Sequence, residues 1–165
     1  MRALVVYESI SGNTRLVAET VANAMAAYGR VELVDVAHAP TTVPADLTLL
    51  IVGASAQAFG SVRGKDSRGP SHQFVPHGRT LREWLDLLHV PLGYAAAAFD
   101  TRVKKPFLPG SAAKTAEKRL GQVGFRIVTP AEGFIIDANT GTLSGGEVER
   151  SELWGAKLGA AFARR

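Results

Sequence analysis

The chain has 165 residues, of which 46% are hydrophobic and 21% charged, a balance typical of a folded globular protein and not of a disordered one. This length suits a single core, so we expect one domain over residues 1–165. The net charge of +4 and the pI near 9.7 mildly favour an acidic partner, and the lack of cysteine excludes disulfides, thiolate catalysis and cysteine-based metal sites.

Nothing in the sequence indicates a membrane span or a secretion signal. No apolar run approaches the ~20 residues that a membrane-spanning helix needs, and Met1-Arg2 leads directly into a strand-like run. We therefore expect a cytoplasmic protein that binds no membrane. Most basic residues are scattered with few aromatic residues between them, so nucleic-acid binding is not expected either.

Short apolar runs alternate with helical patterns along the chain. Runs of strand length predict strands at 3–7, 31–36, 47–52 and 93–99, and a fifth strand in two pieces at 125–128 and 133–136. Between and after these runs, apolar residues recur at helical spacing. The alternation therefore indicates an α/β protein.

The helical patterns carry recognisable start and stop signals. The first helix is predicted over 15–28 and ends at Gly29. Its expected apolar face consists of Leu16, Val17, Val21, Met25 and Tyr28. Thr80-Leu81-Arg82-Glu83 and Ser144-Gly145-Gly146-Glu147 have the form of capping boxes, so each is expected to begin a helix, and Ser111 is expected to begin another.

This order of elements predicts a doubly wound fold, in which helices cover both faces of a parallel sheet. No helix is expected between 36 and 47, because Pro40 and Pro44 leave little room for one. The stretch 54–78 holds six glycines and prolines, and a loop of this length is either functional or mobile.

The turn from Ser9 to Thr14 connects the first predicted strand to the first helix. Its residues Ser9, Ile10, Ser11, Gly12, Asn13 and Thr14 place several backbone N–H groups and three hydroxyls above the positive end of a helix. Ordinary helix capping would also favour serine and asparagine here. Because three hydroxyls converge on one strand-to-helix turn, a phosphate site is the better interpretation.

The segment Val5–Val21, VVYESISGNTRLVAETV, resembles the signature of the flavodoxin family: two apolar residues, an aromatic, a hydroxyl residue, Gly-x-Thr and Ala18. The resemblance implies a flavodoxin-like fold with five parallel strands in the order 2-1-3-4-5. It also implies FMN bound without a covalent link. By similarity, the FMN phosphate would be held by the turn that contains Ser9, Ser11, Gly12, Asn13 and Thr14, with Ile10 among them.

The loop after the third strand resembles the family's second flavin loop. The residues that this resemblance assigns to FMN binding are Ser55, Ala56, Gln57, Phe59 and Gly60. Ser55-Ala56 stands where flavodoxin-like proteins often have Pro-Thr, a departure that frees the backbone and removes a polar contact. Phe59 is expected either to pack on the isoalloxazine ring or to anchor the loop to the core.

The loop after the fourth strand would border the other face of the flavin by the same resemblance. It begins with Asp100, Thr101 and Arg102. Arg102 is expected to stack on the ring or steady the reduced flavin, with a solvated arginine as the alternative. Many flavodoxins have Tyr or Trp at this loop. This chain has neither, and Phe107 is the nearest aromatic residue.

Other site classes fit the sequence less well. The Ser9–Thr14 turn has one glycine where a dinucleotide-binding fold needs G-x-G-x-x-G, and no Gly-Lys-Ser/Thr occurs for a P-loop. Ser55 has the surroundings of a nucleophile elbow without the second glycine. His72 and His77 with Asp66 lack the spacing of metal ligands, so no metal site is expected.

These observations predict an FMN-dependent electron-transfer protein with no catalytic side chain of its own. Two alternatives remain: a module of the same fold that binds no flavin and acts through protein contacts, and an FMN-dependent NAD(P)H or quinone reductase with the long loop as a lid. Because Arg102, Lys104 and Lys105 lie beside the expected flavin edge, we expect a redox partner with an acidic docking surface.

Overall fold

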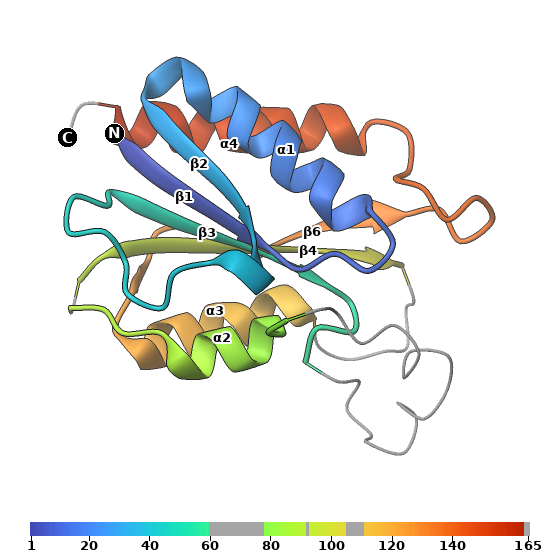
Figure 1. Cartoon of the computed structure of the whole chain (residues 1–165). Coiled ribbons are helices and arrows are strands. Elements are labelled where there is room, and N and C mark those ends of the chain that lie inside the picture. The colour runs from blue at the N-terminus through green and yellow to red at the C-terminus, as the bar shows by residue number, and fades with distance from the viewer. Residues whose placement is uncertain (60–77, 92, 105–110, 164–165) are drawn as a thin grey trace.

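The computed structural model describes residues 1–59, 78–91, 93–104 and 111–163 (Figure 1). The elements in chain order are β1 (Arg2–Tyr7), α1 (Asn13–Met25), the 3-10 helix η1 (Ala26–Tyr28), β2 (Arg30–Asp35), the 3-10 helix η2 (Val36–His38), β3 (Leu49–Ser55), α2 (Leu81–Leu87), β4 (Ala95–Val103), α3 (Ala112–Val123), β5 (Arg126–Ile127), β6 (Glu132–Ile136) and α4 (Glu147–Phe162). In this described part of the chain, none of the helices has the length and hydropathy needed to cross a bilayer.

The strands form one parallel sheet in the order β2-β1-β3-β4-β5, and β6 also pairs with β4. The predicted strand order is therefore confirmed, with β5 and β6 as the two pieces of the fifth strand. Between them, Pro130 has no N–H to donate to the ladder. The N–H of Ala131 donates instead to the Glu117 carboxylate of α3 at 2.6 Å, which takes this segment out of the sheet.

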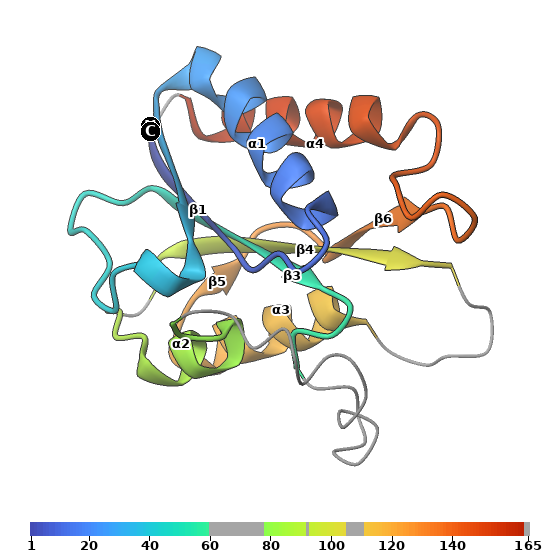
Figure 2. The same cartoon turned by 45° about the vertical axis from the view of Figure 1, so that its right-hand side comes forward.

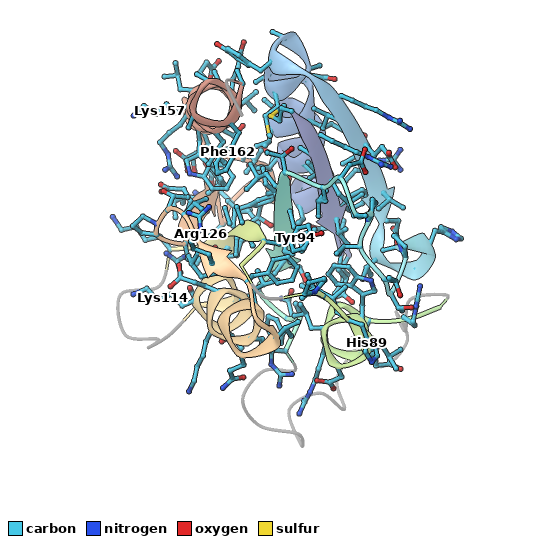
Figure 3. The ribbon with its side chains drawn as sticks, turned by 90° about the vertical axis from the view of Figure 1, so that its left-hand side faces the viewer. His89, Tyr94, Lys114, Arg126, Lys157 and Phe162 are labelled. Atoms are coloured by element: carbon cyan, nitrogen blue, oxygen red, sulfur yellow. The ribbon has the colours of Figure 1, made fainter. Side chains whose placement is uncertain are left out.

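Helices cover both faces of the sheet, as Figures 1 and 2 show: α1 and α4 lie on one face, α2 and α3 on the other. Side chains alternate along each strand, so Val5, Ile51 and Phe99 join the core under α1 and α4, whereas Val6 and Val52 join the core under α2 and α3. Figure 3 looks along this sandwich from the edge where the strands begin. Both faces are thus buried, as the continuous apolar strand runs predicted.

The connection between β2 and β3 contains only the short 3-10 helix η2, as the two prolines predicted. Side chains of α2 and of the residue just before β4 bond to its backbone. The Trp84 indole N–H of α2 donates to the Pro40 carbonyl at 2.9 Å, and the Tyr94 hydroxyl donates to the Ala45 carbonyl at 3.0 Å. This connection therefore packs as part of the layer that contains α2.

Two expectations about helix ends have opposite outcomes. The Thr80–Glu83 capping box is confirmed: the Thr80 hydroxyl accepts the Glu83 N–H, and the Glu83 carboxylate accepts the Thr80 N–H. The second box is wrong: α4 begins after Gly146, whose φ is +87°, and Ser144 contributes no side-chain cap. The reason is that the Glu147 carboxylate is already occupied, since it accepts the Ile135 N–H at 2.7 Å and pairs with Arg150.

The expected apolar face of the first helix is wrong at Leu16, which is 42% exposed, and at Tyr28, which is half-buried in η1 after the end of α1. Val17, Val21 and Met25 are fully buried. These positions and Thr14 lie on one stripe at helical spacing, and Leu16 lies off that stripe. The helix thus buries a narrower face than its apolar residues suggest.

Helices α1 and α4 approach each other closely at Gly155. A Cβ at this position would lie 2.8 Å from the backbone oxygen of Val21, which cannot move without disturbing α1. Replacing an exposed helix glycine by alanine usually stabilises a protein by roughly 0.5–1 kcal/mol. We expect Gly155→Ala to do the reverse and destabilise the fold.

The matched control is Gly121→Ala in α3, because a Cβ added there meets no atom within 4 Å. The free energies of unfolding, measured with urea, should fall for Gly155→Ala by about 1–3 kcal/mol, the usual cost of overpacking, and rise for Gly121→Ala. A Gly155→Ala protein as stable as the parent would contradict the close approach of α1 and α4.

Candidate functional site

The Ser9–Thr14 turn lies at the edge of the sheet where the parallel strands end. The Glu8 N–H still donates to the Gly53 carbonyl at 3.0 Å, after which the chain leaves the sheet. Gly12 has a φ of +92°, a left-handed backbone conformation that residues other than glycine rarely adopt. This residue turns the chain into α1, so the first turn of α1 points back at the end of β1.

The start of α1 presents unpaired backbone donors. In the part of the chain that the structure describes, the N–H groups of Ser11, Asn13 and Thr14 have no protein acceptor. The first N–H groups of any helix lack partners within that helix. Here they adjoin hydroxyl side chains and the positive end of α1, which together favour an anion.

The hydroxyls of the turn act as acceptors toward the protein. Ser9 Oγ accepts the N–H groups of Gly12 at 3.0 Å and Arg15 at 3.3 Å. Ser11 Oγ accepts from the Asn13 side-chain amide at 3.3 Å. A hydroxyl has two acceptor lone pairs but one hydrogen to donate. In both serines that hydrogen remains free, so the turn is suited to a ligand that offers acceptors.

The structure brings residues from all three predicted loops to one face of the sheet end. Thr14 Oγ1 lies 2.8 Å from Thr101 Oγ1, and both are buried. Ser55 is the register partner of Thr101 on the neighbouring strand, so its side chain lies on the same face, under α1. Ser55 Oγ is buried and has no hydrogen-bond partner. A buried hydroxyl without a partner is costly and needs an explanation.

The rest of the second loop is placed differently. Ala56 and Gln57 are exposed, and Phe59 packs against the core under α2 and α3. The Arg119 guanidinium of α3 lies 5.4 Å from the centre of the Phe59 ring. These contacts correspond to the anchoring role expected for Phe59, and a role in stacking on a flavin stays a prediction.

Asp100 and Arg102 lie on the opposite face of the sheet from Thr101. Asp100 is fully buried, and its Oδ2 accepts the Ala113 N–H at the start of α3 at 2.9 Å. Arg102 Nη1 lies 3.6 Å from the same oxygen. Burial raises the pKa of Asp100, and the Ala113 N–H and Arg102 oppose this. Gly133 on β6 leaves the space that both side chains occupy.

Glu8 is a second buried carboxylate on that face, and no local sequence pattern singles it out. Its Oε2 accepts the Leu81 N–H at the start of α2 at 2.7 Å. Burial raises the pKa of Glu8, and the Leu81 N–H partly opposes the rise. Glu8 and Asp100 thus each tie a strand end to a helix start, and neither faces the hydroxyls of the turn.

Several predicted residues lie outside the described part of the chain: Gly60, Asp66, His72, His77, Lys105 and Phe107, together with most of the long loop. Within the described residues, no group of histidines and acids has the arrangement of a metal site. A hollow of about 300 Å³ is present, lined by Tyr94, Arg126 and Phe162 among others. It lies at the edge where the strands begin (Figure 3), opposite the turn, and is not part of this site.

Neither a protein-family model nor a curated protein matches this sequence. The structure is similar to solved flavodoxins over nearly its whole length. Flavodoxin 1 from Bacillus cereus is 20% identical with a TM-score of 0.68, covering 95% of this chain and 96% of that one. A flavodoxin from the domain Archaea is 16% identical with a TM-score of 0.66 and full coverage of both chains.

A Streptococcus pneumoniae TIGR4 flavodoxin is 17% identical with a TM-score of 0.65, covering 98% of this chain and 99% of that one. These similarities, with the strand order, show that the chain has the flavodoxin-like fold. The fold expected from the Val5–Val21 resemblance is therefore confirmed. At such identities a likeness of structure extends to the fold alone.

The buried Glu8 carboxylate makes stability depend on pH in a defined direction. Its pKa in the folded protein lies above the ordinary value, so the folded state holds this proton more tightly than the unfolded state. Its contribution is therefore most favourable at low pH and is lost as pH rises through the folded pKa. We expect Glu8→Gln, which keeps an acceptor for Leu81, to gain stability relative to the parent as pH rises from about 4 to 7.

Urea unfolding at several pH values measures this difference. The control is Glu152→Gln on the exposed surface of α4, whose difference from the parent should change little over the same range. If the Glu8→Gln difference were equally flat, the carboxylate would not be held in a desolvated place.

Proposed function

We propose that this chain binds FMN through the Ser9–Thr14 turn and acts as an electron-transfer protein. The observation that carries the proposal is the set of unused donors at the turn: three backbone N–H groups and the hydroxyl hydrogens of Ser9 and Ser11. A phosphate offers only acceptor oxygens, which is the complement of this set. The flavodoxin-like fold makes FMN the phosphate ester of choice.

The residues present fit the phosphate of FMN. Ser55 Oγ, buried and unpartnered beside the Thr14–Thr101 pair, supplies one further donor on the same face. Arg15, the nearest cation in sequence, has its Nε 2.8 Å from Glu19 and is largely exposed. Neutral donors and the end of α1 would therefore hold the phosphate, without a paired charge.

The ring of FMN has fewer obvious contacts. Phe59 is engaged by Arg119, and Arg102 is engaged by Asp100. The described residues of the third loop, 101–104, include no aromatic side chain. The phosphate is thus expected to carry a larger share of the affinity than ring stacking does. Bound FMN supplies the redox chemistry, and the chain's own residues hold and orient it.

The engaged Phe59 and Arg102 also favour a second candidate function. A domain with the same fold whose ring contacts have been diverted to internal packing would bind no flavin and act through protein contacts. The two candidates differ in a simple observable, because FMN that is bound tightly co-purifies and gives a visible absorption spectrum.

The first test of the proposal is the affinity for FMN. We expect the purified protein to bind FMN, and the combined change Ser9→Ala and Ser11→Ala, which removes both unused hydroxyl donors, to weaken binding at least tenfold, because each lost contact to a charged group is worth about 1.5–3 kcal/mol. Riboflavin, which lacks the phosphate, should bind weakly to both proteins. Quenching of flavin fluorescence measures all four affinities.

The control for this pair is Thr20→Ala, which removes an exposed hydroxyl of α1 that bonds only to the Leu16 carbonyl. Its FMN affinity should equal that of the parent. A parent protein that stays colourless after incubation with FMN would support the flavin-free candidate. Unchanged affinity in the double variant would place the phosphate elsewhere.

Ser55 allows a test in which stability and binding move in opposite directions. Its unpartnered hydroxyl costs the free protein about 1–3 kcal/mol, so Ser55→Ala should unfold at a higher urea concentration than the parent. If the hydroxyl serves the phosphate, the same variant should bind FMN more weakly. A more stable variant with parental affinity would exclude Ser55 from the site.

The partner would dock at the basic rim next to this edge. Lys104 has no ion-pair partner among the described residues, and Arg102 lies at the same strand end. We propose an acidic redox partner, whose association should slow as salt is raised from about 50 to 500 mM because the attraction is screened. Stopped-flow reduction measures the rate, with Lys104→Ala expected to reduce the salt dependence. A rate independent of salt would contradict an acidic partner.

A further inference from the structure

A side-chain contact joins the Ser9–Thr14 turn to a distant part of the chain. Asn13 is buried, and its Nδ2 donates to the Gly141 carbonyl at 2.8 Å. The same amide donates to Ser11 Oγ at 3.3 Å. One side chain therefore ties the turn after β1 to the connection between β6 and α4, which lies beside the first turn of α1 in Figures 1 and 2.

The connection between β6 and α4 is built to hold that carbonyl in place. It is a small hairpin, defined here as residues 136–143 and closed by the bridge between Ile136 and Leu143. The Asp137 N–H donates to the Thr142 carbonyl at 2.7 Å, and the Gly141 N–H donates to the Asp137 carbonyl at 2.8 Å. The hairpin thus has internal hydrogen bonds that do not depend on Asn13.

Gly141 sets the direction of the carbonyl through its backbone conformation. Its φ is +73°, and a Cβ added there meets no atom within 4 Å. The requirement for glycine is therefore conformational and not steric. A residue that disfavours positive φ would turn the carbonyl away from Asn13 without touching the Ser9–Thr14 turn.

The contact also affects the hydrogen bonding of the Ser11 hydroxyl. Because Ser11 Oγ accepts from Asn13, its own hydrogen remains available for a different acceptor. The Asn13 Nδ2 group has two hydrogens, and the one donated to the Gly141 carbonyl fixes the amide so that the other can reach Ser11 Oγ. The hairpin thus acts on the phosphate donors through one side chain.

We propose that Asn13 is a positioning residue that fixes the phosphate turn against the 136–143 hairpin, so that the hairpin controls phosphate affinity without contacting the ligand. The proposal rests on the proposed phosphate site for its effect on FMN. The backbone N–H of Asn13 is one of the unused donors of the turn, whereas its side chain bonds to the hairpin.

The experiment compares Asn13→Ala with Gly141→Ala, which removes no donor from the turn. Each should weaken FMN binding about three- to tenfold, the range expected for one net hydrogen bond, and leave riboflavin binding unchanged. Because both substitutions act through one contact, the double variant should bind FMN no more weakly than the single variant with the lower FMN affinity. A variant that merely loosened the fold would lose both ligands.

The matched control is Gly145→Ala, two residues after the hairpin, where a Cβ meets nothing within 4 Å and φ is not positive. It should bind FMN as the parent does. Thermal unfolding midpoints verify that each variant is folded. If Gly141→Ala binds FMN like Gly145→Ala, the hairpin does not position the turn.

A measurement without ligand separates this proposal from the proposed function. In ¹H–¹⁵N spectra of the free protein, Gly141→Ala should shift the amide signals of Ser11, Asn13 and Thr14, and Gly145→Ala should not. If the parent binds no FMN, the proposed function fails while these shifts still decide whether the hairpin positions the turn. Unmoved signals in Gly141→Ala would overturn the positioning role.

Discussion

The parallel pairing of β1, β3 and β4 is the constraint on which the candidate site depends. Tyr7 pairs with Gly53, and Ser55 pairs with Thr101, so the ends of three strands are aligned at one edge. Parallel strands require long crossover connections, usually helical, and these bring each chain segment back to start in the same direction. Loops far apart in sequence therefore converge, and Thr14 of α1 reaches Thr101 at 2.8 Å.

Side-chain alternation then divides the polar groups of this edge into two sets. Hydroxyls such as Ser55 and Thr101 face α1, whereas the carboxylates of Glu8 and Asp100 face α2 and α3. Each carboxylate bonds to a backbone N–H at a helix start, which offsets part of the cost of burying it. The carboxylates thus secure the starts of α2 and α3, and they lie on the face of the sheet opposite to the hydroxyls that face α1.

The fold could be predicted from the sequence because strand lengths and helix periodicity are local, and both cores follow from them. The site could be predicted only as a list of loops. The Ser144–Glu147 box failed because the Glu147 carboxylate accepts the Ile135 N–H of β6 and pairs with Arg150 one turn further along α4. Likewise, no local signal connects Asn13 with Gly141, 128 residues away, since the contact exists only after β6 is placed next to β4.

The same alternation gives a physical meaning to the Ser55-Ala56 departure from Pro-Thr. Successive residues at a strand end point to opposite sides, and here Ser55 is buried under α1 while Ala56 is exposed. A hydroxyl at the second position would have lain with the exposed loop. At the first position it lies beside the Thr14–Thr101 pair. The departure thus places a hydroxyl on the face of the Ser9–Thr14 turn and not in the exposed part of the second loop.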